Sequence, residues 1–225
     1  MVEPLVPDDI VAAARHVTAT LAPAVDADWT VPADAVGWDV RSTVLHSISC
    51  VTCYTVDLAS QATARVPVSI DVREHATNEE VLRVLGATAQ MMALVATASP
   101  ATARGYHEGG MADTSGFLAM AIDEVIMHGA DAAAGLGLAY DPPERLARKV
   151  VDRLFPWAPP DTDGWTALRW ANGRLPLPGQ PEIRPNWSWQ CAPLDEWEGD
   201  IRFHRRHPPR SFVWDADAGR WRPVP

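Results

Sequence analysis

The residues best suited to bind a metal ion are Glu124 and His128. They lie four positions apart in a segment, residues 120–131, whose composition predicts a helix. Side chains at positions i and i+4 of a helix project from the same face, with Cβ atoms about 5 to 6 Å apart. They can therefore share one ion if a third ligand comes from elsewhere, and His46, on an earlier predicted helix, is the candidate.

The spacing of this pair is weak support when taken alone. With 29 acidic residues and 7 histidines in 225 residues, an acid four positions before a histidine arises about once by chance. The chain contains three such pairs, Asp71/His75, Asp200/His204 and Glu124/His128. Only Glu124/His128 lies on a long, strongly periodic predicted helix, beside its apolar stripe. A carboxylate desolvated there needs a metal, a protonated histidine or an arginine as its partner, so a simple ion pair is the alternative to a metal site.

Two cysteines follow His46 on the same predicted helix face, Cys50 at i+4 and Cys53 at i+7. A C-x-x-C pair also occurs in zinc knuckles and redox motifs, but these place it on a tight turn or at a helix N-terminus. Here the pair is in the middle of a helix. We expect buried small core residues, with Cys50 and Cys53 possible neighbours of the metal. His107 lies between glycines and is expected to be a solvated loop residue.

A second group of polar residues is basic. Arg202, Arg205 and Arg206 make the end of an acidic chain locally positive. A solvated face or salt bridges is the simpler interpretation, and an anion-binding patch is the alternative.

The composition limits the classes of function. The formal charge of −10 disfavours nucleic-acid binding, because such a chain repels a phosphate backbone. No segment approaches the roughly 18 uninterrupted apolar residues of a membrane-spanning helix. Three cysteines cannot all pair with one another, and the first residues lack the pattern of a secretory signal. We therefore expect a cytoplasmic protein, monomeric or homodimeric, that binds neither nucleic acid nor membranes.

Helical periodicity dominates residues 1–155, with little of the alternation typical of strands. Four long helices are predicted: one after Pro7, one capped by Asp39, one capped by Asn78 and one beginning at Ser115. A shorter helix is expected from Pro142 to Phe155. These elements predict an all-α fold, an antiparallel four-helix bundle that forms a domain of residues 1–155.

The composition changes after Phe155. Eight of the ten tryptophans and twelve of the twenty prolines lie in residues 156–225. Proline interrupts long helices, and only residues 165–172 look helical there. We expect an irregular extension, with short helical and extended segments, that packs on the bundle through its tryptophans.

Three motifs resemble a known family. Residues 29–32 (Trp-Thr-Val-Pro), 37–46 (Gly-Trp-Asp-Val-Arg-Ser-Thr-Val-Leu-His) and 123–132 (Asp-Glu-Val-Ile-Met-His-Gly-Ala-Asp-Ala) look like the metal-binding domain of mycothiol-dependent maleylpyruvate isomerases, in the DinB-like superfamily. The resemblance covers about residues 8–140. It implies that His46, Glu124 and His128 hold a divalent metal, usually zinc, although nickel, iron or manganese also suits these ligands. It also implies that Asp131 orients a ligand histidine.

The resemblance further implies an activity with a small thiol, mycothiol, as cosubstrate. Two nitrogens and one carboxylate leave a position open, as in catalytic zinc sites. A thiolate formed there attacks a small electrophile, giving S-transfer or cis–trans isomerisation. The isomerases carry an α/β C-terminal domain that this chain replaces with its extension, so their substrate is not carried over. A non-catalytic, metal-stabilised binding module and a metal-dependent hydrolase are the alternatives.

Overall fold

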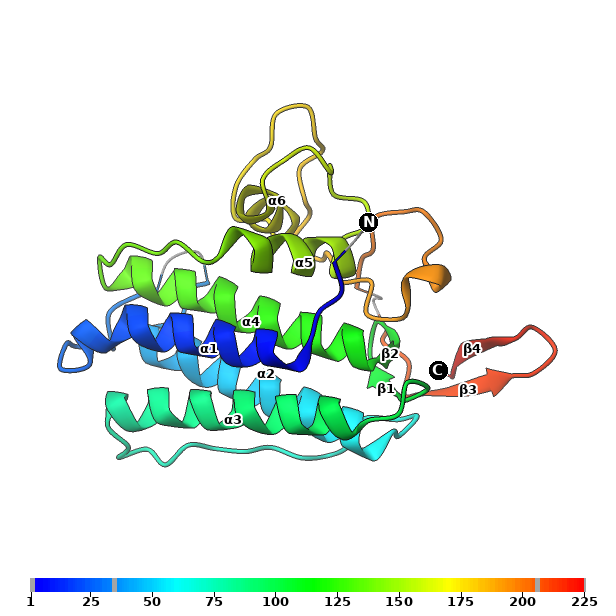
Figure 1. The fold of residues 1–225 in the computed structure, drawn as a ribbon, viewed down its shortest axis with the longest axis horizontal. Coiled ribbons are helices and arrows are strands. Elements are labelled where there is room, and N and C mark those ends of the chain that lie inside the picture. The colour runs from blue at the N-terminus through cyan, green and yellow to red at the C-terminus, as the bar shows by residue number, and fades with distance from the viewer. Residues whose placement is uncertain (1–2, 34–35, 205–206, 225) are drawn as a thin grey trace.

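Six α-helices and four strands form the regular structure of residues 3–33, 36–204 and 207–224, which the computed structural model describes (Figure 1). The helices are α1 (Pro7–Leu21), α2 (Val40–Ser60), α3 (Asn78–Ala98), α4 (Thr114–Gly135), α5 (Glu144–Leu154) and α6 (Gly164–Ala171). The strands are β1 (Arg104–His107), β2 (Gly110–Asp113), β3 (Ser211–Asp215) and β4 (Arg220–Val224). β1 pairs with β2, and β3 with β4, each in an antiparallel hairpin.

The prediction of an all-α four-helix bundle is wrong. The fold is mixed α/β, with 48 % helix and 11 % strand, and it has six helices in its described part. β1 and β2 were missed, and extended segments were expected only in the extension, because a strand of four or five residues is too short for a clear alternation of apolar and polar positions. The glycine-flanked segment around His107, expected to be a loop, instead forms the first hairpin, in which Gly105 lies in β1 and His107 pairs with Gly110 across a tight turn.

α2, α3 and α4 each begin directly after a polar residue that caps the helix, whereas the N-cap of α1 is Val6. The Asp39 carboxylate accepts a hydrogen bond from the Ser42 backbone N–H at 2.6 Å, as predicted for the cap of α2. α3 and α4 begin within one residue of the expected positions, but their caps are Thr77 and Asp113. For α3, Thr77, the residue just before the predicted cap Asn78, accepts the free amide of Glu80, and for α4 Asp113 accepts that of Gly116.

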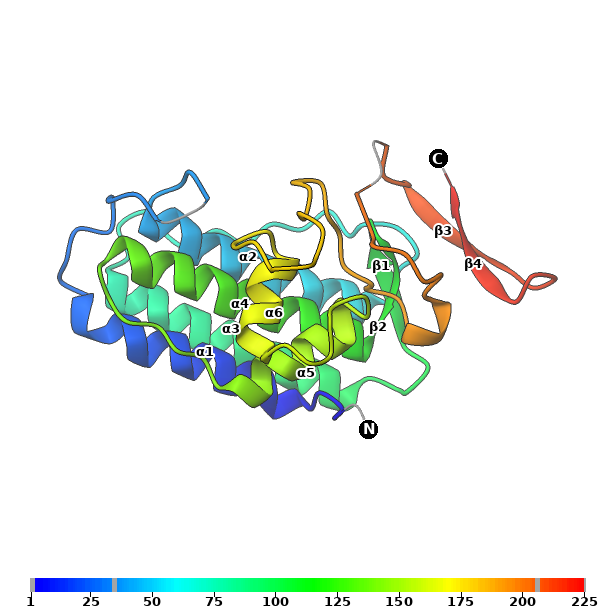
Figure 2. The ribbon, with the colours of Figure 1, turned by 90° about the horizontal axis from the view of Figure 1, so that it is seen from above.

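The four long helices lie side by side, and α4 is the most enclosed of them. α1 and α2 each pack against both α3 and α4, while α5 crosses α4 from the opposite side and carries α6 (Figures 1 and 2). Every residue of α4 from 116 to 127 is buried. A helix that is covered all round desolvates its acidic residues as well as its apolar ones.

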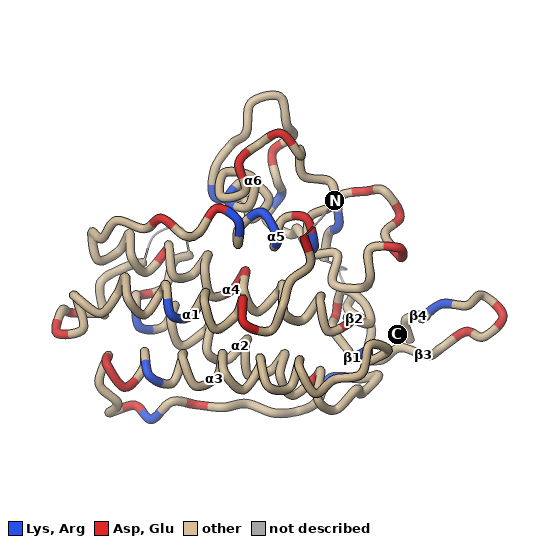
Figure 3. The backbone as a smooth tube through the Cα atoms, viewed as in Figure 1, with Lys and Arg blue, Asp and Glu red and all other residues tan. Residues whose placement is uncertain are grey.

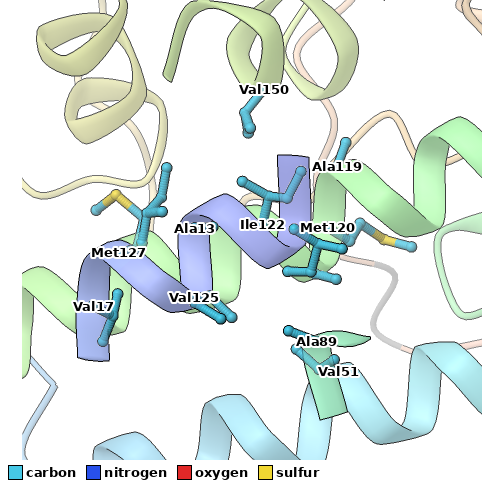
Figure 4. Packing of buried hydrophobic residues seen from close by; sticks show 14 of the residues in the cluster. Ala13, Val17, Val51, Ala89, Ala119, Met120, Ile122, Val125, Met127 and Val150 are labelled. Carbon is cyan, nitrogen blue, oxygen red and sulfur yellow. The ribbon is translucent and has the colours of Figure 1, made fainter. Parts of the chain in front are cut away.

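Small and medium-sized apolar side chains let the neighbouring helices approach α4 closely (Figure 4). The labelled contributors are Ala13 and Val17 from α1, Val51 from α2, Ala89 from α3, Val150 from α5, and Ala119, Met120, Ile122, Val125 and Met127 from α4. Complete burial of a valine or isoleucine side chain contributes about 1.5 to 3 kcal/mol to folding. This packing fixes the position of α2 relative to α4, on which the candidate site depends.

Helix α3 is the only described helix long and apolar enough to cross a membrane by length and composition, with a mean hydropathy of 1.5. One side of it packs against α1 and α2. Met91 and Leu94 are exposed on its other side.

Basic residues of α5 form ion pairs with acidic residues of the N-terminal segment, and Figure 3 marks where charged residues lie along the backbone. The buried Lys149 ammonium lies 3.0 Å from a carboxylate oxygen of Asp9, at the start of α1. Arg145 pairs with Glu3 at 2.6 Å. The ammonium of Lys149 is therefore compensated although it is buried.

Arg153, on α5, binds the C-terminal extension close to the start of α4. The buried Arg153 guanidinium donates hydrogen bonds to the carbonyl oxygens of Gln190, Cys191 and Ala192, at 2.8, 3.0 and 3.2 Å. A Cβ atom added at Gly116 would collide with the Cys191 carbonyl oxygen and with this guanidinium. The extension therefore passes α4 at a point where only glycine fits.

Candidate metal centre

The carboxylate of Glu124 is the centre of the candidate site. Its Oε2 atom lies 3.5 Å from Nε2 of His46, on α2, and 3.2 Å from Nε2 of His128, on α4. Its Oε1 atom accepts a hydrogen bond from the Tyr54 hydroxyl at 3.3 Å. The Glu124 side chain is only 9 % exposed, so these contacts replace most of its hydration.

His128 is held in the orientation of a metal ligand by two further residues. Its Nδ1 atom lies 3.2 Å from a carboxylate oxygen of Asp131. Asp131 in turn accepts hydrogen bonds from the Arg174 guanidinium at 3.2 and 3.0 Å. A carboxylate on Nδ1 places the proton of a neutral imidazole there and leaves the Nε2 lone pair free. This arrangement is common for histidines that bind zinc.

Cys50 adds a sulfur atom to the same place. Its Sγ atom lies 3.3 Å from Nε2 of His46. His46, Cys50 and Glu124 each offer one ligand atom, and the three atoms lie within 4.8 Å of one another; no other group of this kind is found in the described part of the chain. The predicted set, with His128 in place of Cys50, does not bring all three ligand atoms within this distance, although Nε2 of each histidine lies within 3.5 Å of Oε2 of Glu124.

The surroundings of Glu124 and His128 favour the charged form of both side chains. Burial opposes ionisation of Glu124, but hydrogen bonds from His128 and His46 outweigh it and hold the Glu124 pKa below its ordinary value. Burial also opposes the charged form of His128, but Asp131 and Glu124 raise its pKa to about 9. For Cys50, burial raises the thiol pKa, and the charge of Glu124 adds to the effect. Without an ion, His128 therefore carries the proton that compensates Glu124.

A cavity of about 450 Å³ opens beside these ligands. His46, Cys50 and Glu124 line one part of it. The rest of its wall comes from the α2 residues Ser49, Cys53, Tyr54 and Asp57, from Arg65, Val66 and Val68, from Tyr106, His107 and Glu108 of the first hairpin, and from Trp189 and His204 of the extension. The volume suits a small organic molecule.

An aromatic ring covers both histidines of the site. The Trp38 ring centroid lies 4.9 Å from that of His46 and 6.1 Å from that of His128. Trp38 is 44 % exposed, which is unusual for so large an apolar side chain. It limits access to the two histidines from its side.

The acid next to Glu124 has a structural role. Asp123 faces the extension, where it accepts hydrogen bonds from Nε1 of Trp189 at 2.8 Å and from Nδ2 of Asn172 at 3.0 Å. Burial raises the Asp123 pKa to about 7, although both hydrogen bonds act in the opposite direction. Consecutive acids of α4 therefore serve different partners, Glu124 the histidines and Asp123 the extension.

The structure brings most of the predicted site residues together. His46, Glu124, His128, Asp131 and Cys50 form one contact network, and Cys53 lines the adjoining cavity. Of the predicted basic residues, Arg202 lies apart from this network. Arg202 is 3.6 Å from Glu198, and Arg205 and Arg206 lie outside the described residues.

Two residues of the site were missed or misjudged in the sequence. Tyr54 follows His46 at i+8, on the same helix face as Cys50, and this spacing was a usable signal. The prediction that His107 is a solvated loop residue is wrong. It ends β1, with its ring 6.0 Å from that of Tyr54 and 5.8 Å from that of Trp189. No local pattern indicates these contacts, because they join three distant segments.

No protein-family model, curated protein or solved structure matches this chain. The chemistry of the site therefore carries the functional argument. Two imidazole nitrogens, a carboxylate oxygen and a nearby thiol are the donors that zinc prefers, whereas magnesium and calcium prefer oxygen alone. The residues present fit a divalent transition metal or zinc.

Proposed function

We propose that this protein is a metal-dependent transferase or isomerase that uses a low-molecular-weight thiol to attack a small electrophile. Mycothiol is the thiol implied by the resemblance of the three motifs. The observation that carries the proposal is the Glu124 carboxylate between Nε2 of His46 and Nε2 of His128, at 3.5 and 3.2 Å, beside a cavity of about 450 Å³.

His46, Glu124 and His128 are the proposed ligand set. His128 has the Asp131 and Arg174 support typical of a metal-binding histidine, and Tyr54 holds the second oxygen of Glu124. Three protein ligands leave a position for a substrate atom. A metal bound there lowers the pKa of a thiol that reaches it, and the thiolate is the stronger nucleophile.

The surroundings of the site suit a sulfur atom and a small electrophile. Sγ of Cys50 already packs 3.3 Å from Nε2 of His46, so an atom of this size is accommodated beside the ligands. Burial keeps the Cys50 thiol protonated by raising its pKa. Cys50 is therefore a poor nucleophile itself, and the attacking thiol is proposed to come from the cosubstrate.

The position of Cys50 also supports a second candidate function. If His46, Cys50, Glu124 and His128 all bind the metal, four protein ligands close the site, as in structural zinc sites. The protein is then a metal-stabilised binding module without metal-based catalysis. Cys50→Ser separates the two, because loss of a ligand lowers the metal affinity, whereas loss of a neighbour leaves it nearly unchanged.

Metal content tests the ligand set directly. Elemental analysis of the purified protein is expected to give one metal ion per chain. His46→Ala, Glu124→Gln and His128→Ala are each expected to lose most of it. His75→Ala is the matched control, because His75 is an exposed histidine in the connector between α2 and α3. Equal metal content in all of these variants would refute the site.

Thermal unfolding tests the thiol. Zinc alone is expected to raise the melting temperature, and mycothiol is expected to raise it further only when zinc is present. Chelation should abolish both effects. A shift with zinc and none with mycothiol would favour the binding module. Transfer of mycothiol to an electrophile, lost in His46→Ala, would establish the transferase.

A further inference from the structure

The hairpin formed by β3 and β4 projects beyond the end of the helices (Figures 1 and 2). Its base is fixed to the body, because Phe212 packs against Tyr106 and Met111 of the first hairpin. The Phe212 backbone N–H also donates a hydrogen bond to the carbonyl oxygen of Thr63 at 2.7 Å. A two-stranded hairpin needs such packing, since it is marginally stable by itself in water. Its outer half, residues 213–220, extends past this support.

The outer half carries apolar side chains that its own chain leaves exposed. Trp214 is 54 % exposed and Val213 is 45 % exposed. Trp214 packs against Trp221 across the hairpin, with ring centroids 5.6 Å apart. Because residues two positions apart in a strand share a face, Trp214 lies on the same face as Phe212. The apolar face that begins on the body therefore continues beyond it, and tryptophan is among the residues enriched at protein interfaces.

The end of the chain differs in charge from the rest. Residues 201–225 contain six arginines and two acidic residues, whereas residues 1–200 contain 13 basic and 27 acidic residues. β4 carries two of these arginines, Arg220 and Arg222, and both are exposed (Figure 3). A basic hairpin on an acidic body is attracted to the acidic surface of another copy of the same chain.

A groove of about 760 Å³ lies between β4 and the acidic segment 195–198. Arg220 and Arg222 line it from β4, and Asp195 and Glu198 line it from the acidic segment. One face of the chain thus presents both signs of charge side by side. In a two-fold symmetric pair such a face is self-complementary, because the basic part of each copy meets the acidic part of the other. A second copy therefore satisfies both parts at once.

We propose that this face is the interface of a symmetric homodimer, in which β4 of each copy lies against the acidic segment of the other. Trp214 of each hairpin then packs into the groove of the other copy, where Trp197 and Trp221 provide an apolar lining. Among the described residues, none lines both this groove and the cavity beside the metal ligands. Dimer formation is therefore independent of the proposed metal and thiol chemistry.

Sedimentation of the full chain tests whether the dimer forms. Between about 1 and about 200 µM, analytical ultracentrifugation is expected to show a monomer–dimer equilibrium. Raising the salt concentration from about 0.1 M to about 1 M should weaken the dimer, because the charges at its edge are then screened. Trp214→Ser should weaken it at least about 30-fold, as for the tryptophans that dominate other interfaces. Leu94→Ser is the matched control, since Leu94 is 62 % exposed but lies on α3, outside the groove.

Two charge reversals test the arrangement of the two copies. Arg220→Glu and Asp195→Arg each place like charges opposite each other, and each variant should be monomeric at these concentrations. An equimolar mixture of the two variants should form a heterodimer, because the two reversed charges then face each other and again have opposite signs. A defect in folding cannot produce this recovery on mixing. The metal content of both variants should equal that of the unchanged protein.

Three results would each overturn the proposal. The first is a protein that stays monomeric at about 200 µM, which would leave the groove to a partner other than a second copy. The second is a dimer that persists in Trp214→Ser and in both charge reversals, which would place its interface elsewhere. The third is a mixture of the two charge reversals that remains monomeric, which would refute the pairing of β4 with the acidic segment.

Discussion

Zinc affinity is expected to depend on pH through His128. The Nε2 lone pair that would bind the metal is available only after His128 loses its proton, and its neighbours raise the His128 pKa to about 9. pH 7 is about two units below this pKa, so the protonated form of His128 is favoured about 100-fold over the neutral form. Zinc must displace this proton, and its apparent affinity is therefore lowered about 100-fold, or by about 2.7 kcal/mol. Between pH 7 and 9, we expect the apparent affinity to rise about tenfold per pH unit.

The folding stability of the metal-free protein depends on pH in the opposite direction to the zinc affinity. The raised pKa means that the protonated His128 stabilises the fold fully below its unfolded value of about 6.5, and this contribution disappears as the pH rises through 9. Raising the pH therefore weakens the ion pair of His128 with Glu124 and strengthens metal binding. The two species should respond to pH in opposite directions.

Competition with a chromophoric chelator measures the affinity, and calorimetry in buffers of different ionisation enthalpy measures the protons released. About one proton from His128 should be released per zinc at pH 7. Asp131→Asn is the informative variant, because the amide oxygen of the new side chain can still accept a hydrogen bond from Nδ1 but lacks the charge that raises the pKa. Its zinc affinity should therefore level off at a lower pH than that of the unchanged protein. An affinity that is constant from pH 7 to 9, without proton release, would refute His128 as a ligand.

Three further predictions concern residues around the ligands. Tyr54→Phe removes the hydrogen bond to Oε1 of Glu124 and should lower zinc affinity about tenfold in the same competition assay; an unchanged affinity would show that Glu124 does not need this support. Asp123→Ala leaves Trp189 and Asn172 without their acceptor and should cost about 2 kcal/mol in urea unfolding. Because burial raises the Asp123 pKa to about 7, this cost should be largest at low pH and shrink as the pH rises through 7; a cost that grows instead would contradict the raised pKa. Trp38→Phe should remove most of the change in tryptophan fluorescence caused by nickel or cobalt, since Trp38 lies over both histidines; an undiminished change would place the metal elsewhere.

Local signals in the sequence were sufficient to predict the elements that carry the site. A helix needs only its apolar period, a capping residue and a stop, all within one short segment. Asp39 therefore marks the start of α2, and the spacing of Glu124 and His128 places both on one face of α4. The short strands β1 to β4 are harder to predict in this way. They are stabilised by pairing with a neighbouring strand, and a segment of four or five residues gives little indication of its partner.

The sequence alone thus determined which side chains share a helix face, because helix geometry is the same in every protein. It could not determine which faces meet. The packing of α2 against α4 brings His46 within 3.5 Å of Glu124, and the return of the extension brings Trp189 to Asp123 and against His107. These contacts join residues more than 60 positions apart, and their geometry depends on how all the buried side chains fit together. The predicted ligands are a property of the sequence, and the cavity beside them is a property of the tertiary structure.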